Sequence, residues 1–104
     1  MDRRIVWSRE AAADLEALAR YIAKDSLFYA AAVVQEILDA SRSLRRFAER
    51  GRIVPELGDR KFRELLIRGY RLIYRLEESQ VLIVGLVHRK RNLKRLWRRG
   101  KRNG

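Results

Sequence analysis

The strongest constraint on the fold is a pair of neighbouring segments in the last third of the chain. In the first, residues 70–76, apolar side chains alternate with mostly basic ones, as in a β-strand. One face would carry Tyr70, Leu72, Tyr74 and Leu76, and the other Arg71, Ile73 and Arg75. After the polar turn 77–80, the run Val81–Val87 is continuously apolar, which indicates a strand that is central in a sheet or covered on both faces.

Two further strands and a loop are predicted around this pair. The segment Phe62–Ile67 has strand character, and Arg68-Gly69 supplies a tight reversal into residues 70–76. At the N-terminus, Ile5 and Trp7 alternate with their neighbours in a short strand. Residues 51–60 contain the only proline and two of the six glycines, so they are expected to form a loop between helix and sheet.

Residues 9–51 carry helical periodicity in two blocks. Ser8 is a good N-cap, and Ala11, Leu15, Leu18 and Ile22 follow at spacings of four, three and four, which predicts a helix over about Arg9–Lys24. Asp25-Ser26 interrupts the pattern. A second helix is then predicted from its apolar period, ending at Gly51; that period is Val34, Ile37, Leu38, Ser41, Leu44 and Ala48.

These elements predict an α+β fold in which an N-terminal strand and an antiparallel helical hairpin precede a three-stranded antiparallel meander. The hairpin should cover one face of a mostly antiparallel sheet. A chain of 104 residues has the size of one domain, which we assign to residues 1–91, followed by a basic C-terminal extension at 92–104.

Composition narrows the compartment and the kinds of site. The longest apolar run is far shorter than the roughly 20 residues that span a bilayer, and the N-terminus does not resemble a secretory signal. The absence of cysteine removes thiolate metal ligands and cysteine nucleophiles. We therefore expect a soluble cytoplasmic protein with no cofactor, no metal and no membrane partner.

The charge is high and unevenly distributed. Lys and Arg number 25 against 13 Asp and Glu, a net charge of +12. Nine of the basic residues and none of the acidic ones lie between Arg89 and the C-terminus, which leaves 16 against 13, or +3, for the rest. Such a cationic tail indicates a polyanionic partner, although it could serve only solubility.

Five segments, in order, carry a family resemblance. They are Val6–Ala11, Leu18–Ala23 with Tyr21 and Ile22, Arg63–Leu65, Tyr70–Arg75 and Val87–Arg91. Over about residues 4–91 the chain resembles the RelE/ParE toxin superfamily, and specifically its ParE-like branch. The resemblance implies a toxin held in a hetero-oligomer with a cognate antitoxin whose extended segment wraps it. ParE-like members poison DNA gyrase, whereas RelE-like members cut messenger RNA on the ribosome.

Two mechanisms follow, and the residues allow both. An RNA-cleaving enzyme without a metal needs proton-transfer groups and cations around the phosphate. The candidates are Arg71, placed by the resemblance, His88 as the only histidine, and Arg89, beside Lys90 and Arg91. Glu56, in the loop after Pro55, could in principle act as the base. Alternatively, Arg71 lies on a solvated sheet face, His88 only caps its strand and Glu56 is only a turn carboxylate.

The second mechanism is inhibition by binding alone. The basic end of the last strand and the extension would then form a docking element, with partner-binding residues Lys90, Arg91, Leu93, Lys94, Leu96 and Trp97. The apolar members of this set could instead pack back onto the sheet as core. A plain nucleic-acid-binding module is a third possibility. We predict a gyrase poison, with ribosome-dependent cleavage second, and antitoxin contact along the sheet edge and helical hairpin.

Overall fold

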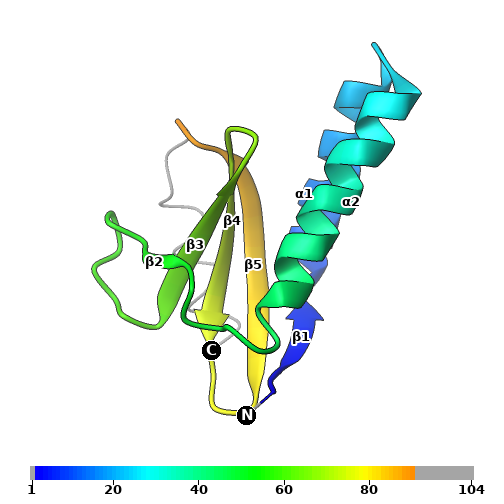
Figure 1. The fold of residues 1–104 in the computed structure, drawn as a ribbon. Helices are drawn as coiled ribbons and strands as arrows, with labels where there is room; N and C mark the ends of the chain where they lie inside the picture. The colour runs from blue at the N-terminus through cyan, green and yellow to red at the C-terminus, as the bar shows by residue number, and fades with distance from the viewer. Residues whose placement is uncertain (1, 91–104) are drawn as a thin grey trace.

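Two serines define where the helices begin. The computed structural model describes residues 2–90, and in it α1 (Arg9–Ala23) and α2 (Leu27–Ser43) form the predicted antiparallel hairpin (Figure 1). The Ser8 Oγ accepts a hydrogen bond from the Ala11 N–H at 3.0 Å, and the Ser26 Oγ accepts one from the Tyr29 N–H at 3.0 Å. Within the described residues, neither helix is both long and apolar enough to cross a membrane.

The predicted end of the second helix is wrong. The helix ends at Ser43, and Gly51 lies beyond a series of turns. The Leu44 and Arg45 N–H groups donate to carbonyls three residues back, those of Ser41 and Arg42, which tightens the last turn. Leu44 and Ala48 are nevertheless buried, so their apolar spacing reflects packing of the turns that follow the helix.

Within residues 2–90 the sheet contains five strands. They are β1 (Arg4–Trp7), β2 (Arg52–Ile53), β3 (Phe62–Ile67), β4 (Tyr70–Leu76) and β5 (Gln80–His88), in the spatial order β1-β5-β4-β3-β2. The N-terminal strand and the meander β3-β4-β5 are confirmed, and β1 pairs with β5 in parallel. Arg68 and Gly69 both have positive φ, 50° and 81°, as a two-residue hairpin turn requires. The short strand β2 lies in the segment predicted as a loop.

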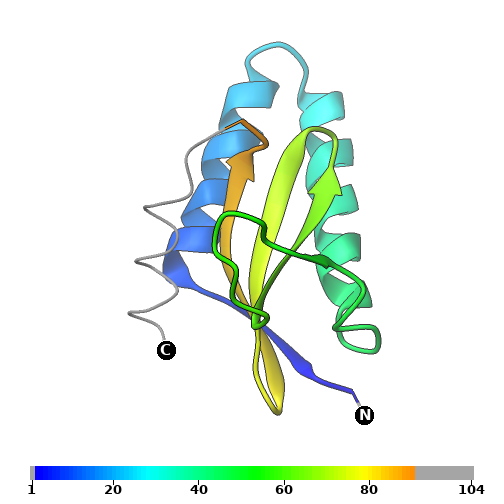
Figure 2. The same cartoon turned by 90° about the vertical axis from the view of Figure 1, so that its left-hand side faces the viewer.

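The two central strands, β4 and β5, are covered on both faces. One cluster of core residues joins the helices to the sheet, including Leu18, Ile37 and Ile83. A second cluster, which includes Val54, Phe62 and Ile73, lies on the opposite face. Figure 2 shows the segment between α2 and β3 crossing this face, with the helices behind the sheet. This second layer is the segment between α2 and β3, and it explains why residues 81–86 have no solvent-exposed side.

A register shift in β5 lets its apolar run serve both layers. Ile73 pairs with Gly85, but the next residue of β4, Tyr74, pairs with Ile83, so one residue of β5 is extra. Before the shift Ile83 faces the helices, and after it Leu86 does, although the two positions differ in parity. A continuous run is needed here because an alternating one would place polar side chains in a core.

The buried Tyr74 joins the second layer to the sheet. Its hydroxyl donates to the Ala48 carbonyl at 2.8 Å and accepts from the Gly51 N–H at 3.0 Å. A Cβ added to Gly51 would lie 2.5 Å from that hydroxyl oxygen, so the position accepts only glycine without a shift. The hydroxyl therefore fixes the point at which the chain leaves the helical layer.

The substitution Tyr74→Phe should lower the free energy of unfolding by about 2 kcal/mol, because the buried Gly51 N–H and the Ala48 carbonyl lose their partner. Urea unfolding measures the loss. The control is Tyr21→Phe on the exposed face of α1, which should change stability by less than about 0.5 kcal/mol. Equal effects of the two substitutions would contradict the role of the Tyr74 hydroxyl.

Candidate functional site

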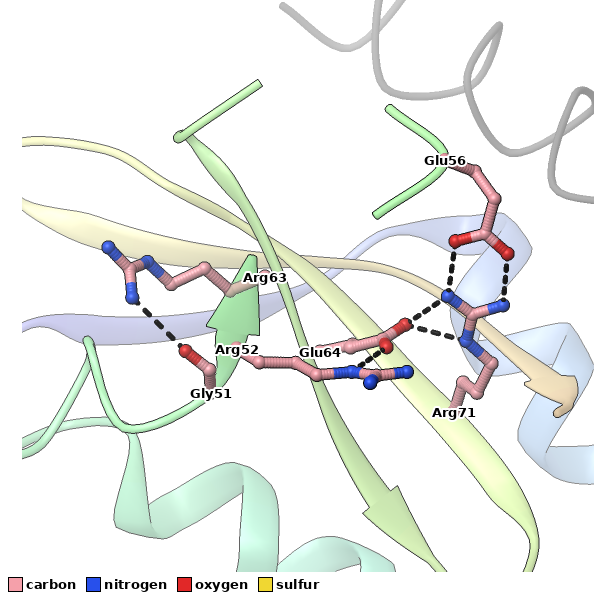
Figure 3. Close-up of polar contacts among 6 residues, drawn as sticks. All are labelled: Gly51, Arg52, Glu56, Arg63, Glu64 and Arg71. Atoms are coloured by element: carbon pink, nitrogen blue, oxygen red, sulfur yellow. Dashed lines mark hydrogen bonds and ion pairs between the residues drawn. The ribbon is translucent and has the colours of Figure 1, made fainter. Parts of the chain in front are cut away.

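Arg71 lies at the centre of a buried charge cluster on the face of the sheet opposite the helices. Its residue exposure is only 3%. The two terminal nitrogens donate to the two carboxylate oxygens of Glu56 at 2.8 Å each, and Nε donates to Glu64 Oε1 at 2.6 Å (Figure 3). All three guanidinium nitrogens therefore already donate to carboxylates, and the face that could have been solvated is covered.

Glu64 is the buried carboxylate of the cluster. Its side chain is fully buried on β3, and its second oxygen accepts from Arg52 Nε of β2 at 2.5 Å. Because Leu66 pairs with Arg71 in the hairpin register, Glu64 lies on the same face of the sheet, two residues along β3. Two carboxylates thus balance two guanidiniums in the cluster.

The hydrogen bonds between Arg71 and Glu56 shift the pKa values of both side chains. The hydrogen bonds from Arg71 lower the pKa of Glu56 to about 2, so this carboxylate is ionised at neutral pH. Hydrogen bonding to Glu56, followed by the smaller effect of Glu64, raises the pKa of Arg71 further. Glu56 and Arg71 are therefore both charged at neutral pH.

An open cleft of about 500 Å³ lies over the cluster. Its walls come from β2, from the segment after it, from β3 and β4, and from the residues beyond β5. They are Arg52, Pro55, Glu56, Leu66, Arg71, Arg89 and Lys90. The cleft thus brings Arg71 together with Arg89 and Lys90 at the end of the last strand, and the half-exposed Glu56 carboxylate that pairs with Arg71 also lines it.

His88 lies on the other side of the sheet. Its ring meets the edge of the Tyr70 ring at a centroid distance of 5.7 Å, and Tyr70 packs against the helix-side core. The Nδ1 atom of His88 accepts a hydrogen bond from the Lys90 N–H at 3.3 Å. The structure therefore does not bring His88 into the cleft that holds Arg71 and Arg89.

The remaining predicted site residues lie outside the described part of the chain. These are Arg91, Leu93, Lys94, Leu96 and Trp97. Tyr74 is fully buried and Tyr70 is partly buried against the core, so both tyrosines have a packing role. Among residues 2–90 no group of three or more acidic or histidine side chains is placed to hold a metal ion.

The sequence-based prediction missed two members of the cluster, Glu64 and Arg52. A signal for the first was available: Glu64 alternates in phase with the apolar Phe62, so it had to face a covered side of the sheet. The turn at Arg68-Gly69 then fixes the register that brings Glu64 beside Arg71. No comparable pattern points to Arg52, because β2 has only two residues.

Comparison with known proteins gives one family match and two structural likenesses. The family model described as ParE toxin of type II toxin-antitoxin system, parDE, matches residues 5–93. No curated protein matches the chain. The fold is similar to the chromosomal ParDE TA system from P. aeruginosa, with a TM-score of 0.68, 24% identity, and coverage of 83% of this chain and 95% of that chain. It is also similar to a double mutant of the E. coli toxin RelE in the free state, with a TM-score of 0.67, 11% identity, and coverage of 99% and 98%.

The pKa of Glu56 predicts how acid weakens the fold. A carboxyl whose pKa falls from 4.5 to about 2 on folding adds stability that is fully present above pH 4.5 and is lost as the pH falls through 2. Glu56→Gln should therefore cost about 1 kcal/mol at pH 7, a modest value because the carboxylate is half-exposed. The gap between variant and parent should close between pH 4.5 and 2, as measured by urea unfolding across this range.

The matched control is Glu16→Gln on the exposed face of α1, away from any arginine of the cluster. Its effect on unfolding should be small at every pH. A stability gap for Glu56→Gln that stays constant down to pH 2 would contradict the assigned ion pair.

Proposed function

The chain belongs to the ParE toxin family of type II toxin–antitoxin systems, and from this premise we propose that it arrests growth by binding and poisoning DNA gyrase. A cognate antitoxin would neutralise it in a toxin–antitoxin complex. The gyrase target follows from the resemblance to the ParE-like branch. What the residues of this chain add is an argument about mechanism, namely inhibition by binding without cleavage of RNA.

The state of Arg71 carries this argument. A metal-independent nuclease needs a cation that is free to stabilise the charge that develops on the phosphate. Here Arg71 donates from all three nitrogens to Glu56 and Glu64, so a phosphate would have to displace a bidentate carboxylate. The displaced carboxylate would then repel the phosphate from close range.

The proton-transfer group is also poorly placed for RNA cleavage. His88 packs on Tyr70 on the helix side of the sheet, whereas the cationic cleft opens on the other side. A general base must come within about 3 Å of the proton it removes. An arrangement in which the base and the phosphate-binding cations lie on opposite faces favours a binding role for the exposed cations.

Ribosome-dependent cleavage of messenger RNA is the second candidate. It is favoured by one observation, the gathering of Arg71, Arg89 and Lys90 in a single cleft. For this function, Glu56 would have to leave Arg71 when RNA binds, and another group would have to replace His88 as the base.

We assign target docking to the exposed Arg89 and Lys90 together with the extension that follows them. Purified toxin should inhibit gyrase supercoiling and leave ribosome-bound messenger RNA intact. The double substitution Arg89→Gln and Lys90→Gln should weaken the inhibition about tenfold, which is roughly 1.4 kcal/mol of binding free energy. Removal of residues 92–104 should abolish it.

The control pair is Arg9→Gln with Arg20→Gln, which removes the same charge from the exposed face of α1. It should leave gyrase inhibition unchanged, as should His88→Ala. Cleavage of ribosome-bound transcripts by the parent protein, lost in His88→Ala, would overturn the gyrase proposal in favour of the nuclease. Arg71 is unsuitable for this test because its loss would leave Glu64 short of a buried partner.

For the antitoxin, we propose the tip of the helical hairpin as an anchor. Apolar side chains gather there without cover in the described structure, with Leu27 78% and Phe28 86% exposed, beside an exposed Tyr21. Patches of this kind mark interaction sites on small proteins. The edge of β3 beyond its two-residue pairing with β2 could accept an added strand from an extended peptide.

The double substitution Leu27→Gln and Phe28→Gln should weaken the complex with the cognate antitoxin by more than tenfold. Thermal stability should be unchanged, because both side chains are exposed. Co-purification and titration calorimetry measure the binding. The control is Phe47→Gln, an exposed aromatic residue after α2; equal weakening by the control would remove the hairpin tip from the antitoxin interface.

A further inference from the structure

A second basic surface lies at the end of the molecule away from the cleft. Arg3 and Arg4, at the start of β1, line a shallow hollow with Arg42 and Arg45, at the end of α2. The Arg3 N–H donates to the Arg45 carbonyl at 2.8 Å, so the two segments are tied together by backbone. We call these four residues the arginine patch; Asp2 and Ile5 complete its lining.

The arginine patch keeps its positive charge available. Arg3 Nε donates to the Glu77 carbonyl at 2.9 Å, and Arg4 donates to the side-chain amide oxygen of Gln80 at 3.2 Å, both neutral acceptors. None of the ion pairs within residues 2–90 involves these two arginines or Arg45. The guanidiniums of Arg3 and Arg4 are thus oriented by hydrogen bonds without being neutralised.

Among residues 2–90, the one ion pair made by a patch side chain is exposed to solvent. Arg42 pairs with Asp39 at 3.2 Å, and both side chains are 63% exposed. Asp2 lines the hollow, but its ion pair, at 4.0 Å, is with the neighbouring Arg46. Exposed pairs of this kind are weak and exchange readily for another anion. The hollow therefore has an excess of positive charge, in contrast to the balanced cluster around Arg71.

The patch and the cleft are separate sites. β5 runs from Gln80, whose side chain contacts Arg4, to His88, next to the cleft residues. A strand of this length covers roughly 26 Å. A ligand on the arginine patch would therefore not occupy the cleft.

From this geometry we propose that the arginine patch binds the phosphate backbone of double-stranded nucleic acid. Guanidinium groups match phosphate oxygens in two-point hydrogen bonds. Among the described residues, the lining of the hollow contains no aromatic side chain on which a base could stack, which favours a duplex with outward phosphates over a single strand. The proposal is independent of whether gyrase is the toxin's target.

The test is binding of the full chain to a fluorescent 20-base-pair DNA duplex, followed by anisotropy over a range of salt concentrations. The double substitution Arg42→Gln and Arg45→Gln should weaken binding about tenfold at low salt. It should also reduce the slope of log K against log salt concentration by about 2, one for each lost phosphate contact. These two arginines have no buried contact, and circular dichroism should show an unchanged fold. The other two are left in place because their hydrogen bonds hold β1.

The matched control is Arg9→Gln with Arg20→Gln, which has the same net charge. It should keep the parental salt slope. Equal losses in the two double variants would show that DNA responds only to total charge and would overturn the proposal. A duplex of RNA is expected to follow the DNA result, because the contacts are to phosphates. Poly-glutamate, an anionic polymer without phosphates, is the second probe. If the Arg42→Gln and Arg45→Gln variant loses affinity for poly-glutamate as strongly as for DNA, the assignment to nucleic acid fails.

Discussion

The structure depends on the fact that its central strands have no solvent side. β4 and β5 pack against the helices on one face, and against the segment between α2 and β3 on the other. That segment is mostly irregular, and many of its backbone hydrogen bonds only close local turns within it. Side chains must fix it instead: Tyr74 binds its beginning, Val54 fills the core beneath it, and Arg71 holds Glu56 near its turn.

This structural need limits what Arg71 can do chemically. The energy of a buried guanidinium is acceptable only because Glu56 and Glu64 complete its hydrogen bonds. An arginine paired in this way stabilises the fold, and a phosphate would have to compete with two carboxylates for its donors. The proposed binding mechanism is compatible with such an arrangement, because the target would contact exposed side chains at the rim, such as Arg89 and Lys90.

Local rules predicted the elements, and long-range packing set their limits. The serine caps, the Arg68-Gly69 turn and the double-sided burial of residues 81–86 follow from sequence, because each depends on neighbouring residues or on a regular period. The end of α2 was misplaced because the buried Leu44 and Ala48 continue its period in non-helical turns. The Glu56 contact had no precursor, since a loop without a period brings it to Arg71 from fifteen residues away.

Net charge conceals the most informative difference between the arginines of this chain. The residues before Arg89 sum to only +3, which suggests a nearly neutral body with a basic tail. In the described structure, however, the buried Arg71 is paired with carboxylates, whereas Arg3 and Arg4 donate to neutral acceptors. A buried guanidinium such as that of Arg71 needs its carboxylate partners, because an unpaired charge is costly out of water. A body of small net charge can therefore still present a surface whose positive charges are free to meet an anion.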